Sequence, residues 1–125
     1  MEQGTDINKE DNNGYTTFFD ACSSGNEHLV RYLMKFGADI NKQGNDGATP
    51  VFITCNKGHE NLVEYLEEQG AYINKQNKNG ETPLFKACSE GHENIVEYLE
   101  ERGADIHKQN KNNYLKLVMK DTKML

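Results

Sequence analysis

The chain has 125 residues, of which 14 are Lys or Arg and 20 are Asp or Glu, so its formal net charge is −6. A protein that grips a phosphate backbone needs a concentrated basic surface, so this balance disfavours nucleic acid as a partner. The apolar runs are too short to span a membrane, and residues 1–20 lack the apolar stretch of a secretory signal. We therefore expect a cytoplasmic protein, with the nucleus as the alternative.

A sequence unit recurs along the chain every 33 residues. The segment GADIN at 37–41 returns as GAYIN at 70–74 and as GADIH at 103–107, and residues 44–76 match residues 77–109 at 20 of 33 positions. A period of this length indicates a stack of small units rather than one globular core around a buried pocket. The question of function therefore becomes which partner the protein binds.

The repeats divide the chain, as a single repeat domain over residues 1–125, into five parts. In chain order these are a partial repeat tail at 1–10, repeat 1 at 11–43, repeat 2 at 44–76, repeat 3 at 77–109, and a degenerate fourth repeat or C-terminal cap at 110–125. The incomplete ends fit two hypotheses, either terminal caps or a piece of a longer array.

Within repeat 2 the residue pattern predicts a turn, a helix, a second turn, a second helix and an extended finger. The turn is predicted at Asp46-Gly47, and Thr49-Pro50 is typical of a helix start, since Thr caps free N–H groups and Pro fits the first turn. We expect the first helix to end at Gly58, and the second to run from near Glu60 to residue 70. Helices this short are unstable alone, so stability must come from stacking.

The motifs resemble those of the ankyrin repeat family. Its Gly-x-Thr-Pro-Leu-His pattern appears as GATPVF at 47–52 and GETPLF at 80–85, and its Gly-His pair at 58–59 and 91–92. The resemblance implies an all-α repeat solenoid of stacked helix-turn-helix units with β-turn or hairpin fingers. Phe19, Phe52 and Phe85 replace the family's imidazole, so we expect apolar packing where that imidazole would act as a polar tether.

The resemblance further implies a non-catalytic module that binds a protein partner on its concave side, through turn tips and first helices. Among these positions Tyr15 is the only aromatic residue, and it is the predicted binding hot spot. The predicted contact positions are Asn12, Asn13, Tyr15, Ser23, Ser24, Asn45, Asp46, Ala48, Asn56, Lys57, Lys78, Asn79, Glu81, Ser89 and Glu90.

No residue cluster predicts catalysis, a metal site, a cofactor or a small-molecule substrate. Cys22, Cys55 and Cys88 recur at 33 residues, which favours small buried free thiols over ligands or a disulfide. His59 and His92 follow the helix-ending glycine, where we expect them to bond backbone groups. The glutamates of the second helices fall on solvated faces, without the cleft that acid–base chemistry needs.

Three further hypotheses concern the chain's context. It could be a regulatory or scaffolding segment of a larger polypeptide whose flanking domains carry the activity. Asn41 lies in a context that resembles the asparagines hydroxylated in ankyrin repeats. We also expect a monomer or weak end-to-end association, through apolar residues assigned to the two ends: Phe18, Phe19, Met34, Leu115, Leu117 and Met119.

Overall fold

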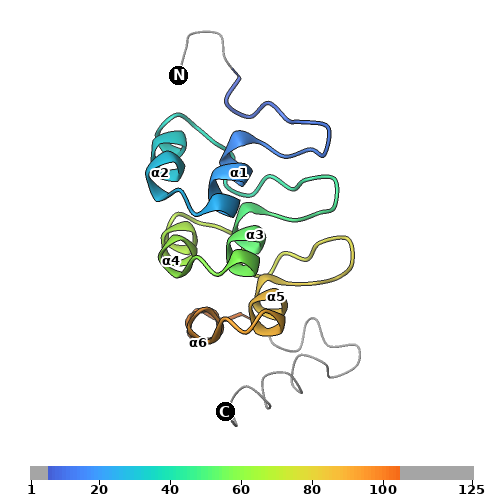
Figure 1. Ribbon diagram of the computed structural model, residues 1–125, viewed down its shortest axis with the longest axis vertical. Coiled ribbons are helices and arrows are strands. Elements are labelled where there is room, and N and C mark those ends of the chain that lie inside the picture. The colour runs from blue at the N-terminus through green and yellow to red at the C-terminus, as the bar shows by residue number, and fades with distance from the viewer. Residues whose placement is uncertain (1–5, 105–125) are drawn as a thin grey trace.

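The computed structural model describes residues 6–104, which form six helices in two layers (Figure 1). One layer holds the first helix of each repeat and the other holds the second, while the fingers extend from the first-helix layer (Figure 1). No strand occurs in residues 6–104. The helices are α1 (Thr17–Ser24), α2 (Glu27–Lys35), α3 (Pro50–Lys57), α4 (Glu60–Glu68), α5 (Pro83–Ser89) and α6 (Glu93–Glu101).

The first helix of each repeat begins at a threonine cap. The hydroxyl oxygens of Thr16, Thr49 and Thr82 accept the N–H groups three residues on, at 3.3, 3.2 and 3.1 Å. A proline opens α3 and α5, whereas α1 begins at Thr17 at the equivalent position. The threonine cap is therefore common to all three repeats, and the proline is not required to place the helix start.

The core is a ladder of equivalent side chains from the stacked repeats. In the first-helix layer Phe18, Val51 and Leu84 are at most 1% exposed. The three cysteines beside them are buried free thiols, as the 33-residue spacing predicts. Burial raises the pKa of Cys22 to about 12 and that of Cys88 to about 11, so these thiols stay protonated and unreactive near neutral pH.

Two histidines link each repeat to the repeat before it. The Nε2 atom of His59 lies 3.0 Å from the carbonyl oxygen of Ser23, and that of His92 lies 3.0 Å from the carbonyl oxygen of Asn56. A carbonyl only accepts, so Nε2 must donate. The predicted backbone contact is confirmed, and the structure adds that each imidazole reaches back to the preceding repeat.

The glycine that ends the first helix leaves room for this imidazole. Gly25 and Gly58 cap α1 and α3 in the left-handed conformation, with φ of 76° and 82°. A Cβ placed on Gly58 would stand 2.6 Å from Cε1 of His92. This position therefore needs glycine for two separate reasons, its backbone angle and its contact with the next repeat.

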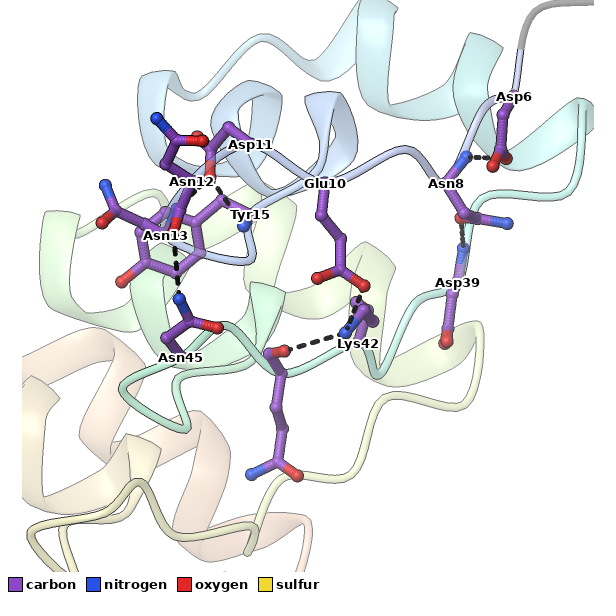
Figure 2. A network of polar contacts seen from close by, with 11 residues as sticks. Asp6, Asn8, Glu10, Asp11, Asn12, Asn13, Tyr15, Asp39, Lys42 and Asn45 are labelled. Carbon is purple, nitrogen blue, oxygen red and sulfur yellow. Dashed lines mark hydrogen bonds and ion pairs between the residues drawn. The ribbon is translucent and has the colours of Figure 1, made fainter.

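The fingers are also bonded to one another. The N–H of Asn45 donates to the carbonyl of Asn13 at 2.8 Å, and the N–H of Lys78 donates to the carbonyl of Asp46 at 2.9 Å. Figure 2 shows further links between the first two fingers, among them the ion pair of Glu10 with Lys42 at 3.0 Å. The fingers thus form a continuous edge with a fixed spacing.

The expectation that Phe18 and Phe19 are exposed at one end is wrong. Phe18 is fully buried and Phe19 is 6% exposed, because each packs with the residues of the following repeat. Met34 is half-buried against the core. Leu115, Leu117 and Met119, the other residues on which end-to-end association was predicted, lie outside the described residues.

Replacing Gly58 should be more damaging than replacing Gly91. Both have positive φ, but no described atom lies within 4 Å of a Cβ built on Gly91. We expect Gly91→Ala to lower the free energy of unfolding by about 1 kcal/mol through backbone strain. Gly58→Ala should lower it by about 2–3 kcal/mol, since the methyl group also displaces His92. Urea unfolding followed by circular dichroism measures both.

The double variant Gly58→Ala/His92→Ala is the control for this prediction. Without the imidazole, the substitution at Gly58 should cost only what the substitution at Gly91 costs. An equal cost of Gly58→Ala in the presence and absence of His92 would contradict the role assigned to the contact.

Candidate functional site

A groove of about 510 Å³ runs between the fingers and the first helices of the three repeats. Its walls come from the second and third fingers, and its floor comes from α1 and α3. The lining residues are Tyr15, Phe19, Asp20, Ser23, Asp46, Ala48, Phe52, Ile53, Asn56, Lys57, Asn77, Asn79, Glu81 and Lys86.

The structure brings about half of the predicted contact positions into this groove. Those that line it are Tyr15, Ser23, Asp46, Ala48, Asn56, Lys57, Asn79 and Glu81. Ala48 is only 3% exposed and contributes mainly to the floor. The remaining predicted positions lie on exposed surface outside the lining: Asn12, Asn13, Ser24, Asn45, Lys78, Ser89 and Glu90.

Six lining residues were missed by the sequence reasoning: Phe19, Asp20, Phe52, Ile53, Asn77 and Lys86. The resemblance predicted that the two phenylalanines pack between repeats, and this packing forms the groove floor. Asp20, Ile53 and Lys86 occupy one and the same position in the three first helices, 33 residues apart. This position changes from acidic to apolar to basic across the three repeats, and that change is the sequence feature that could have identified it as a candidate contact position.

The groove floor is a small apolar cluster separate from the main core. Phe19, Phe52 and Ala48 form it, with Tyr15 and Ile53 packed against its side. The predicted replacement of a polar tether by apolar packing is therefore confirmed for Phe19 and Phe52. Phe19 and Phe52 are only 6% and 5% exposed, so the apolar surface that stays open in the groove belongs mainly to the half-buried Tyr15 and Ile53.

Tyr15 is held in place by the protein itself. Its ring stacks on Phe19 with centroids 4.0 Å apart and planes 3° apart, and its hydroxyl donates to a carboxylate oxygen of Asp46. Gly44 lies against the same ring, so that a Cβ there would stand 2.0 Å from Cε1. Desolvation and the bond to Asp46 raise the pKa of Tyr15 to about 12. Tyr15 therefore joins repeats 1 and 2 as well as lining the groove.

The charged residues of the groove are unevenly arranged. Glu81 and Lys86 lie 3.9 Å apart and offset each other. Asp20 and Lys57 take part in none of the ion pairs found among the described residues, and both are exposed. Asp46 is already hydrogen-bonded to Tyr15. The end of the groove near Tyr15 is thus acidic, while Lys57 lies at the C-terminal end of α3.

Asn41, the predicted hydroxylation site, has a structural role. Its side-chain oxygen accepts the N–H of Tyr72 at 2.9 Å, and its amide nitrogen donates to the carbonyl of Gly70 at 3.4 Å. Asn8 makes the equivalent bonds to Asp39 and Gly37 one repeat earlier. Asn41 therefore fastens one repeat to the next, and its hydroxylation stays a prediction.

Residues 6–104 show neither a metal-binding cluster nor a membrane-spanning helix. No group of three or more His, Cys, Asp or Glu side chains in this region is arranged to hold a metal ion. No helix there has the length and apolar character needed to cross a membrane.

Comparison with known families agrees with this geometry. The profile for ankyrin repeats, in three copies, matches residues 1–77 and 36–110, and the chain belongs to the ankyrin repeat family. A comparison with curated proteins finds no significant match. Ankyrin repeats are generally protein-interaction modules and are typically non-enzymatic.

The hydroxyl of Tyr15 should stabilise the stack of the first two repeats. Tyr15→Phe keeps the ring on Phe19 but removes the bond to Asp46, so we expect the free energy of unfolding to fall by about 1 kcal/mol. Gly44→Ala should cost more, because its methyl group cannot coexist with the ring. Urea unfolding would contradict this if Tyr15→Phe and wild type were equally stable.

A second prediction concerns alkaline pH. The hydroxyl of Tyr98 donates to Glu67 at 2.9 Å. Like that of Tyr15, its pKa is raised from the ordinary 10.0 to about 12. A raised folded-state pKa stabilises the fold below pH 10, and this contribution is lost as the pH rises towards 12. The stability difference between wild type and Tyr15→Phe/Tyr98→Phe should therefore shrink from pH 9 to pH 11. A constant difference in urea unfolding would contradict it.

Proposed function

We propose that this protein is a non-catalytic module that binds a protein partner in the groove between its fingers and first helices. The observation that carries this proposal is the groove itself, with an apolar floor formed by Phe19 and Phe52 beneath a charged and amide-bearing rim. An apolar centre with a polar rim is the usual anatomy of a protein interface.

The groove suits a segment of polypeptide better than a small metabolite. Small-molecule sites enclose most of the ligand's surface, whereas this groove is lined by three successive repeats and is bounded by exposed side chains such as Lys57 and Asn79. Its rim offers amides and charges that can pair with a peptide backbone and its side chains. The rigid, mutually bonded fingers also reduce the ordering cost of binding.

The test requires groove variants that leave the fold intact. Asn56, Lys57 and Asn79 line the groove, and no described interaction uses their side chains; Asn56 and Asn79 contribute only backbone atoms to the bonds found. The triple variant Asn56→Ala/Lys57→Ala/Asn79→Ala should therefore remain folded and lose the partner. Tyr15 is unsuitable for this purpose, because its removal would also weaken the joint between repeats 1 and 2.

The measurement is cross-linking capture from native cell extract, followed by mass spectrometry. The matched control carries three substitutions on the opposite, second-helix face: Glu64→Ala, Glu68→Ala and Glu97→Ala. A protein retained by wild type and by the control, but lost by the groove variant, would support the proposal. Retention by all three would place the contact elsewhere, and the groove would not be the binding surface.

A further inference from the structure

The groove has an electrostatic direction that specifies more about its occupant. Three carboxylates lie around Tyr15, namely Asp11, Asp20 and Asp46, each close enough to raise the pKa of its hydroxyl. Of these, Asp20 and Asp46 line the groove. At the far side, Lys86 is offset by Glu81 at 3.9 Å, which leaves Lys57 as the groove cation for which no ion pair occurs among the described residues.

The two groove carboxylates differ in what they can offer a partner. Asp46 accepts the hydroxyl of Tyr15 and the N–H of Ala48, so its oxygens are already engaged. Asp20 lies on α1, exposed, and takes part in no ion pair found in residues 6–104. Partial desolvation, followed by the nearby Asp11, raises the pKa of the Asp20 carboxyl. A cation beside Asp20 would relieve that repulsion.

The apolar floor begins next to this carboxylate. Phe19 precedes Asp20 in α1 and stacks on Tyr15, and the floor continues through Phe52 and Ile53 of α3. An apolar side chain on this floor and a cation at Asp20 would therefore come from neighbouring positions of one bound segment. The chain's net charge of −6 would also attract a cationic segment before contact.

We propose that the groove selects a peptide segment of its protein partner in which a lysine or arginine lies close to a large apolar residue. The cation pairs with Asp20 at the Tyr15 end of the groove, and the apolar residue packs on the half-buried Ile53 and on the small exposed edges of Phe19 and Phe52, which are 6% and 5% exposed. This assignment rests on the proposed function of the groove and adds the chemistry of its occupant.

The test uses a random dodecapeptide display library panned on the full 125-residue chain. Recovered peptides are then synthesised and their affinities are measured by fluorescence anisotropy against wild type and variants. Asp20→Asn removes the charge with little change in shape, and Asp20→Glu keeps it. Glu64→Gln makes the same carboxylate-to-amide change on the second-helix face and is the matched control. Thermal unfolding checks that each variant remains folded.

The expected result is a set of peptides enriched in lysine or arginine next to an apolar residue. Their affinity should fall about fivefold with Asp20→Asn, as for a single exposed to half-buried ion pair. With Asp20→Glu the affinity should return most of the way to the wild-type value. With Glu64→Gln it should stay within about twofold of wild type. The loss caused by Asp20→Asn should shrink at high NaCl, because screening weakens the pair.

The failures are distinguishable. Peptides that lack a cation, or that bind Asp20→Asn as well as wild type, would overturn this inference. If those same peptides no longer bind Asn56→Ala/Lys57→Ala/Asn79→Ala, the groove would still be a binding surface. Peptides that bind the triple variant unchanged, or the recovery of no enriched peptide, would overturn both the charge assignment and the proposed function.

Discussion

The structure depends on the stacking of helix pairs that are too short to be stable alone. Each second helix has nine residues, and each first helix has seven or eight. Such helices are marginal in water, so their apolar faces must be covered by the neighbouring repeats. The buried ladders Phe18–Val51–Leu84 and Val30–Val63–Val96 supply that cover, and every other feature follows from keeping the repeats in one register.

Three kinds of polar link hold that register. Backbone bonds join the finger tips, asparagine side chains join the finger bases, and histidines join the helix turns. Asn8 and Asn41 each reach the N–H group 31 residues ahead, while His59 and His92 each reach the carbonyl 36 residues behind. An insertion between residues 23 and 39 would fall inside all three kinds of link at once, because the bonds Asn13–Asn45, Asn8–Asp39 and Ser23–His59 all span that stretch.

The fold could be predicted closely because each position of the 33-residue unit occurs in three repeats, so the same structural role is indicated by three residues. The threonine caps, the left-handed glycines and the histidine contacts all occur where the 33-residue pattern expects them. The failures concern residues whose neighbours lie in another repeat. Phe18 and Phe19 were predicted at an exposed end, since the repeat pattern does not show that they pack against the following repeat. Asp20 was not among the predicted contact positions because its place in the groove lining depends on how the repeats pack.

Residues at the finger tips differ between the repeats, and the structure gives a physical cause for some of these differences. The ring of Tyr15 packs against Gly44 of the next repeat and leaves no space for a Cβ at that position. At the position equivalent to Gly44, Asp11 and Asn77 use their side-chain oxygens to accept a backbone N–H of their own finger. Gly44 has no side chain to do so, and in the second finger Asp46 accepts the N–H of Ala48 instead.

Tyr15, Gly44 and Asp46 therefore differ from their counterparts in the other repeats for a structural reason. Tyr15 requires Gly44, the absence of a side chain at Gly44 leaves the second finger to Asp46, and Asp46 also holds the Tyr15 hydroxyl. By contrast, Asp20 and Lys57 differ from their counterparts in the other repeats, and no described side-chain bond accounts for the difference. Contacts between neighbouring repeats explain the first group, which leaves Asp20 and Lys57 as the positions whose differences the proposed binding of a partner would explain.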